Sequence, residues 1–136
     1  MTTAEFPSPA INDDMAPFFA ASAEQRFVIM RCRDCGAWYW PYTGCRNHPN
    51  APYLANMEWT EASGRGNVFS FTIARLQFHA AFPTPYVYAL VELAEGPLMP
   101  GNIIGCAPEE VRVGLPVQVE LRKAPNGLVL PAFRAA

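Results

Sequence analysis

Two pairs of potential metal ligands, separated by nine residues, constrain this chain more than any other feature of its sequence. Cys32 and Cys35 form a C-x2-C pair, and Cys45 and His48 form a C-x2-H pair. Each spacing fits a tight turn that directs both side chains toward one point, and two such turns facing each other make a tetrahedral site of three cysteines and one histidine. Four protein ligands leave zinc no open position for water or substrate. The motif therefore predicts a structural zinc ion rather than a catalytic one.

Other interpretations of the cysteines stay open at this point. A C-x2-C pair can be a redox pair, although the second pair disfavours that interpretation here. Disulfides would require a secreted chain. The first thirty residues contain Asp13, Asp14 and Glu24 and lack the basic start and apolar run of a signal peptide. His48 could instead be a solvated loop residue, and Cys106, in an apolar run, is predicted to be a buried core thiol.

Composition limits the size of the fold and the class of partner. A chain of 136 residues has room for one domain, or for a small domain with an attached module. Only 16% of the residues are charged, which predicts that a partner covers part of the surface. A net charge of -2 disfavours nucleic acid as that partner. No apolar stretch approaches the roughly 20 residues that cross a bilayer, so no membrane is expected among the partners. The thiolate zinc site and the missing signal sequence predict a reducing, cytoplasmic location.

Residues 1–26 are predicted to form an arm and a short helix. Asn12-Asp13-Asp14 is a typical helix start that places negative charge near the helix N-terminus. Pro17 suits the first turn, and apolar residues at nearly helical spacing extend the helix to about Ser22 or Glu24. The apolar face of this helix needs a surface to cover, either in this chain or in another protein.

Residues 27–55 are predicted to form a zinc ribbon. A strand from Arg26 to Arg31 leads into Cys32, and a second strand, Trp38 to Pro41, follows the first ligand pair. Gly36 and Gly44 flank the ligands and allow the backbone angles of tight metal turns. Residues 49–54 resemble a connector.

Residues 56–136 are predicted to form a five-stranded barrel, because apolar residues alternate with a period of two. The predicted strands contain Phe69, Phe71 and Ile73 on one face; Val87, Ala89, Val91 and Leu93; Leu98 to Cys106, interrupted at Pro100-Gly101; Val117, Val119 and Leu121; and Leu128 to Leu130. Residues 108–112 could form one helical turn between the third and fourth strands. This order is typical of an OB-fold barrel, although the spacing alone permits other small barrels. The predicted fold class is therefore mainly β, with a short N-terminal helix, a zinc ribbon and an OB-fold.

The order of these segments resembles a known family. Its members are acyl-CoA-associated proteins with an N-terminal rubredoxin-like zinc ribbon and a C-terminal OB-fold, and they are companions of thiolase-like enzymes. The resemblance rests on Arg31–Gly36 and on four later segments: 63–72, 88–96, 114–117 and 130–134. One departure is that His48 stands where the family usually has the last cysteine, so that one ligand of the usual four-cysteine site becomes a histidine.

The resemblance implies a role rather than a reaction. The chain would be a non-catalytic accessory subunit, not an enzyme, that braces a thiolase-like partner and shapes its CoA-thioester site. The partner's reaction could be thiolysis, condensation or aldol cleavage, and acyl-CoA could lie at the shared interface. Zinc would be a structural cofactor.

The residues agree with the absence of catalysis, since no serine has a histidine at a motif distance. The aromatic residues and one loop histidine are instead candidates for a partner interface. These candidates are Phe18, Phe19, Trp38, Trp40, Phe78, His79 and Phe82. Arg65, Arg75 and Arg112 are candidates for binding the phosphates of CoA, because guanidinium binds phosphate through two hydrogen bonds.

Two other functions compete with the accessory role. A nucleic-acid-binding zinc-ribbon and OB module would need a basic groove with stacking aromatic residues. A stand-alone thioesterase would need an acid–base pair that the sequence does not offer.

Overall fold

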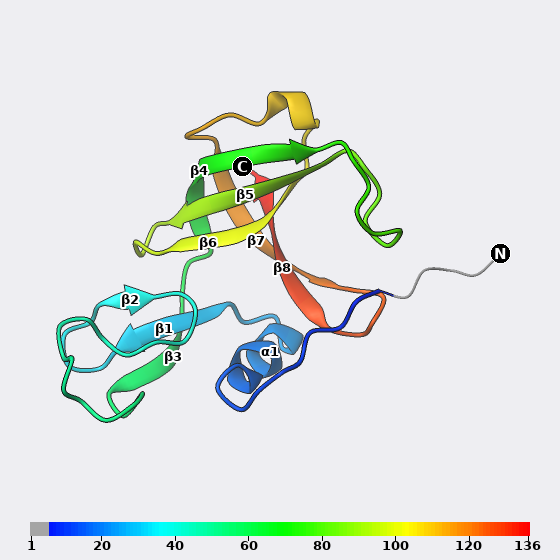
Figure 1. The fold of residues 1–136 in the computed structure, drawn as a ribbon. Helices are drawn as coiled ribbons and strands as arrows, with labels where there is room; N and C mark the ends of the chain where they lie inside the picture. The colour runs from blue at the N-terminus through cyan, green and yellow to red at the C-terminus, as the bar shows by residue number, and fades with distance from the viewer. Residues whose placement is uncertain (1–5) are drawn as a thin grey trace.

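The computed structural model describes residues 6–136, which form a small sheet and a closed barrel with one helix packed against both (Figure 1). The elements in chain order are α1 (Ala16–Ala23), β1 (Val28–Cys32), β2 (Trp38–Tyr39), β3 (Met57–Glu61), β4 (Arg65–Ala74), β5 (Tyr86–Leu93), β6 (Leu98–Ile104), the 3-10 turn η1 (Pro108–Glu110), β7 (Pro116–Lys123) and β8 (Val129–Ala135). The mainly β fold class predicted above is confirmed. Within the described residues, no helix has the length and apolar character of a bilayer span.

Helix α1 begins close to the predicted start. The Asn12 side chain accepts a hydrogen bond from the Met15 backbone N–H at 2.9 Å, and Pro17 lies in the first turn, where its missing N–H is harmless. The buried Ser22 hydroxyl donates to the Val129 carbonyl at 2.8 Å. Because α1 contacts both β1 and β8, it joins the ribbon to the barrel, and its apolar face is covered by this chain itself.

The ribbon sheet has three strands in the order β2-β1-β3. The pairing of β1 with β2 is the predicted hairpin, in which Met30 faces Tyr39. The sequence analysis did not predict β3, which pairs antiparallel with the whole of β1, from Val28 opposite Glu61 to Cys32 opposite Met57. Its sequence carries two glutamates among five residues, and its partner strand lies far back in the chain, so local alternation gave little indication of it.

The barrel closes through the strand order β4-β5-β6-β8-β7, with β7 pairing back onto β4. Strands β6 and β8 are parallel, and every other neighbouring pair is antiparallel. Five strands with a helical turn between the third and fourth form the predicted OB-fold. The predicted inward residues of β5 are all buried, and they are Val87, Ala89, Val91 and Leu93. Phe133 on β8 is also fully buried and completes the barrel core.

Two details of the predicted strands are wrong. The register shifts between Val68 and Ser70, so an irregularity in β4 turns Phe69 outward, and it does not share a face with Phe71 and Ile73, which pack on the core. Strand β6 is not interrupted at Pro100, which lies opposite Leu90 in a continuous pairing. Proline is tolerated there because β8 pairs with β6 only at Ile103 and Ile104, so β6 is an edge strand on that side at Pro100.

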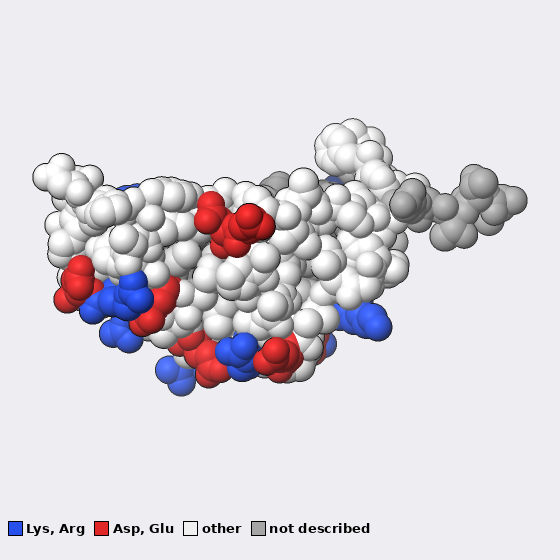
Figure 2. Space-filling model, turned by 90° about the horizontal axis from the view of Figure 1, so that it is seen from below, with Lys and Arg blue, Asp and Glu red and all other residues white. Residues whose placement is uncertain are grey.

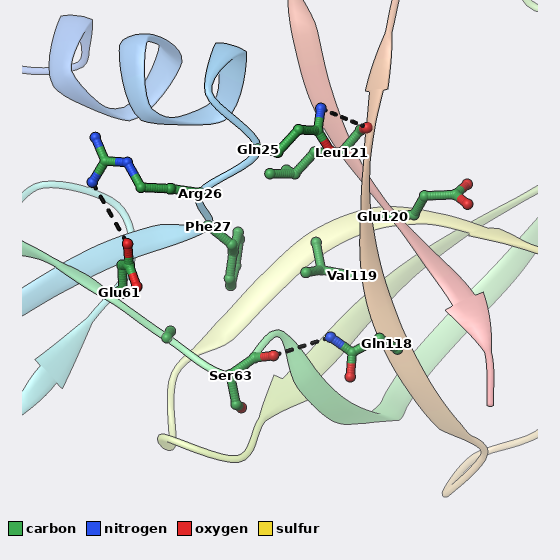
Figure 3. A pocket seen from close by; sticks show the side chains of 10 residues that line it. Gln25, Arg26, Phe27, Glu61, Ser63, Gln118, Val119, Glu120 and Leu121 are labelled. Carbon is green, nitrogen blue, oxygen red and sulfur yellow. Dashed lines mark hydrogen bonds and ion pairs between the residues drawn. The ribbon is translucent and has the colours of Figure 1, made fainter.

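A polar cavity of about 420 Å³ lies where the ribbon meets the barrel (Figure 3). The Gln25 amide donates to the Leu121 carbonyl at 3.4 Å, and the Gln118 amide donates to the Ser63 carbonyl at 3.0 Å. Arg26 and Glu61 form an ion pair at 3.7 Å on its other wall. These bonds join the chain segments of the junction directly, so the ribbon and the barrel are connected by specific polar contacts as well as by α1.

Candidate metal centre and partner surfaces

Backbone turns position the four predicted metal ligands. Cys32 is the last residue of β1, and its carbonyl accepts a hydrogen bond from the Gly36 N–H at 2.9 Å. Gly36 has a φ of 78°, which glycine adopts at little cost, so the chain can turn sharply after Cys35. In the second turn, the His48 N–H donates to the Cys45 carbonyl at 3.1 Å. The first turn joins β1 to β2, and the chain after β2 returns to bring the second turn against it.

The ligand atoms converge on one point. All four atoms, three Sγ and one imidazole nitrogen, lie within 4.8 Å of one another. The Cys35 and Cys45 Sγ atoms are 3.5 Å apart, and the Cys32 Sγ is 3.6 Å from the His48 Nδ1. A tetrahedron with Zn–S bonds of about 2.3 Å has edges of roughly 3.5–3.8 Å, so these separations fit zinc. The donor set leaves no coordination position free, which makes the site structural.

Three polar side chains surround the ligands, and the sequence analysis named none of them as part of the site. The Asn47 amide donates to the Cys35 Sγ at 3.4 Å, and the Asn56 amide donates to the Cys32 Sγ at 3.5 Å. The Tyr39 hydroxyl lies 3.4 Å from the Cys45 Sγ. Donors of this kind stabilise the negative charge of thiolates and orient metal ligands. The adjacency of Asn47 to His48 was the one local signal that could have identified any of them.

The surroundings adjust the acidity of the thiols. The hydrogen bond from Tyr39, opposed by burial, lowers the pKa of the Cys45 thiol from 9.0 to about 7. The Tyr39 oxygen also accepts a hydrogen bond from the Arg46 N–H at 3.0 Å, which leaves its O–H free to donate to sulfur. Burial raises the pKa of the Cys32 thiol, and zinc, which binds the thiolate form, offsets that effect.

The predicted interface residues divide into two groups. In the first group, Phe18 is 3% exposed and packs its ring against Trp40 at 4.9 Å and Trp59 at 5.9 Å. Phe19 is half-buried against the same cluster, and the Arg31 guanidinium stacks over Trp38 at 4.7 Å. Phe18 thus belongs to the core of this chain, because α1 folds back onto the ribbon, and it offers no free surface to a partner.

The second group lies in the loop between β4 and β5 and is exposed. Phe78 is 79% exposed, and Leu76 beside it is also exposed. The Phe82 ring contacts the rings of Phe6 at 5.3 Å and His79 at 5.6 Å. An apolar loop of this kind is unusual on a surface with no partner. The interface role of Phe78, His79 and Phe82 stays a prediction.

The three arginines predicted for CoA phosphates do not form one cluster. Arg65 starts β4 and Arg75 follows its end, so roughly 30 Å of strand separates them. Arg75 pairs with Glu109 of η1 at 3.9 Å, and Arg112 is exposed in the loop after η1. Their contact with CoA stays a prediction. Cys106, the fourth cysteine, is half-buried against the barrel core and lies outside the metal-binding group.

Comparison with known proteins identifies the family. Residues 19–47 match the family described as "ChsH2, rubredoxin-like zinc ribbon domain", and residues 59–122 match "ChsH2, C-terminal OB-fold domain". A relative from Methanocaldococcus jannaschii, named "DUF35 domain-containing scaffold protein", is 31% identical over 105 residues, which cover 74% of this chain and 72% of that protein. This chain belongs to the DUF35 family.

Two further relatives extend the similarity of this DUF35 chain. A Thermomonospora curvata protein named "Probable enoyl-CoA hydratase alpha subunit" is 40% identical over 132 residues. The match covers 96% of this chain but only 40% of that longer protein. A chain in the solved structure titled "Ltp2-ChsH2(DUF35) aldolase" superposes with a TM-score of 0.83 at 38% identity, covering 94% of this chain and 98% of that chain. The predicted zinc ribbon and OB-fold are therefore confirmed, and Cys32, Cys35, Cys45 and His48 are arranged as the metal-binding group of that ribbon.

Proposed function

We propose that this DUF35 protein is a non-catalytic accessory subunit of a thiolase-like enzyme that processes acyl-CoA thioesters. It would brace the partner and help to shape its CoA-thioester site. The observation that carries the proposal is the superposition on a chain of the "Ltp2-ChsH2(DUF35) aldolase" structure, which covers 98% of that chain. The scaffold name of the archaeal relative supports the same role.

The chemistry of the described residues supports a non-catalytic chain. His48 lies in the metal-binding group, and its contact with Cys32 belongs to that closed site. The Nδ1 of His79 accepts a hydrogen bond from the Ala81 N–H at 2.9 Å in an exposed loop. Between residues 6 and 136, no serine or cysteine outside the metal-binding group is hydrogen-bonded to a histidine, as a nucleophile and its base would be.

The distribution of charge supports a protein partner rather than nucleic acid. Figure 2 shows acidic and basic side chains interspersed along one edge of the molecule, while most of the visible face is uncharged. The formal net charge is -2, and an electrostatic footprint for phosphates would require clustered basic residues. The free thiols of all four cysteines fit the reducing cytoplasm that we propose as its compartment.

The test is co-expression of the tagged chain with the thiolase-like proteins of its source, followed by affinity purification and size-exclusion chromatography. We expect one such protein to co-elute in a stable complex and the isolated chain to leave acyl-CoA unchanged. Phe78→Glu should weaken the complex, because it places a charge in the exposed apolar loop. Val113→Glu, the same change at another exposed apolar residue, should not. Unaided thioester turnover by the isolated chain, or co-purification of nucleic acid in place of protein, would contradict the proposal.

A further inference from the structure

An open groove of about 690 Å³ runs along the outside of the barrel, away from the metal centre and the ribbon junction. Its lining comes from β5, β6, β8, the end of β7 and the loop before β5, and Phe6 and Pro7 of the N-terminal segment border it. The side chains that line it are Phe6, Pro7, Phe82, Pro83, Tyr86, Tyr88, Asn102, Ile103, Ile104, Arg122, Lys123, Ala124, Pro125, Leu130, Pro131 and Ala132. Its volume is typical of pockets that hold small organic ligands.

The lining is mainly apolar. Tyr88 is exposed on β5, and the Phe82 and Tyr86 rings lie 6.5 Å apart at one wall. Aliphatic side chains, including Ile104 and Leu130, continue the surface. The one amide in the groove, that of Asn102, already donates to the Val87 carbonyl at 3.1 Å. The mainly apolar lining therefore favours a ligand with an apolar body.

Charge distinguishes this groove from two other cavities of the molecule. Among residues 6–136, Arg122 and Lys123 line it and no carboxylate does. The cavity at the ribbon junction is lined by Glu61 and Glu120 as well as Arg26, and a third cavity is lined by both Arg65 and Glu92. Arg122 contacts Glu120 at 3.6 Å, whereas the described residues place no carboxylate within ion-pair distance of Lys123. An anionic group in the groove would complement Lys123.

The N-terminal segment closes one end of the groove. Phe6 packs edge-on against Phe82 at 5.3 Å. The Asn126 amide, in the loop between β7 and β8, donates to the Pro7 carbonyl at 3.3 Å and to the Ser8 hydroxyl at 3.2 Å. These contacts hold the segment in place, so the groove is a formed site rather than a gap between loops.

We propose that this groove binds an amphipathic organic anion: an apolar chain lies over Tyr86 and Tyr88, and its anionic group pairs with Lys123. A medium-chain carboxylate is the simplest such ligand. The inference concerns the barrel alone and does not depend on the proposed partner. An adenine nucleotide also combines an apolar body with negative charge, so the experiment compares a medium-chain carboxylate with an adenine nucleotide.

The experiment is a titration of the full chain, loaded with zinc, followed by 1H–15N NMR. Octanoate is the probe, and octyltrimethylammonium, with the same chain and the opposite charge, is the matched ligand control. We expect octanoate to shift the amides of Tyr88, Asn102 and Lys123 in a saturable manner. Octyltrimethylammonium should bind at least about fivefold more weakly, the size of one favourable surface charge contact of about 1 kcal/mol. ADP should leave these amides unshifted.

Variants test the named residues. Lys123→Glu should weaken octanoate binding at least fivefold, and Tyr88→Ser should weaken it through loss of apolar contact. Arg65→Glu makes the same charge change at another cavity and should leave binding intact. The proposal is overturned if octanoate shifts other residues or none, if the cation binds equally well, or if Lys123→Glu has no effect. If ADP shifts these amides saturably and octanoate does not, the proposed ligand with an apolar chain is wrong and a nucleotide is favoured.

Discussion

Cys45 shows how much of the metal centre depends on single side chains. Its sulfur completes the ligand set and receives the hydrogen bond of Tyr39, which lowers the pKa of its thiol. Sequence spacing identified Cys45, but not Tyr39, Asn47 or Asn56. Their hydrogen bonds to sulfur depend on how β2 and the later loops fold back toward the ligands. The spacing of residues along the chain does not predict this arrangement.

Replacing Cys45 tests the structural role of zinc. Cys45→Ala should lose its zinc and melt at a clearly lower temperature, because a structural site contributes its binding free energy to folding. Elemental analysis and thermal unfolding measure both effects. Cys106→Ala is the control, since this cysteine lies outside the metal-binding group, and it should keep about one zinc per chain. A Cys45 variant that retains zinc and melts like the parent would contradict the structural assignment.

Gly101 tests the packing of the barrel core. A Cβ atom on Gly101 would lie 2.8 Å from two ring carbons of Phe133, which is buried and cannot move without cost. Gly101→Ala should lower the free energy of unfolding by about 1–3 kcal/mol, as overpacking does. Urea denaturation measures this change. Gly44→Ala has open space around it and should change the free energy of unfolding much less.

At the scale of elements, the strands follow the alternation of the sequence except where the backbone departs from a regular strand. β5 alternates without error along its whole length. β4 begins with the same pattern, but the register shift after Val68 reverses it. A shift of this kind depends on the pairing with β5, so the sequence of β4 alone predicted the wrong face for Phe69.

The reversal in β4 leads to opposite expectations for two neighbouring residues. Val68 is 1% exposed and Phe69 is 51% exposed. Val68→Ala should lower the free energy of unfolding by about 2 kcal/mol, whereas Phe69→Ser, at a half-exposed site, should lower it by about 1 kcal/mol. Chemical denaturation of both variants checks the expectation. If Phe69→Ser lowered the free energy of unfolding more than Val68→Ala does, Phe69 would face the core, contrary to the register shift.

At the scale of the whole molecule, the buried residues form two separate clusters. The larger cluster fills the barrel and continues through α1 to Phe27 and Ile29 of the ribbon. The smaller one surrounds the metal ligands and contains Met30 and Met57. The part of the ribbon near the metal ligands therefore has little apolar support of its own, and we expect zinc to order it.

Removing the metal should therefore loosen the ribbon around the ligands and leave the barrel folded. After treatment of the zinc-loaded protein with excess EDTA, amide hydrogen exchange should rise across residues 32–48 and stay slow in β5. Mass spectrometry of peptides from both regions gives the measurement. Equal acceleration in β5 would show that the barrel, too, depends on the metal, contrary to the separation of the two clusters.

The sequence by itself determined the features that are encoded over a few residues. The paired ligand spacing gave the metal centre, the period of two gave the barrel strands, and Asn12 with Pro17 gave the start of α1. Tertiary structure decided what depends on neighbours distant in the chain. It supplied the pairing of β3 with β1, the outward turn of Phe69, the burial of Phe18 and the groove beside Lys123. Each of these arises from contacts between segments tens of residues apart, whose energies no local pattern records.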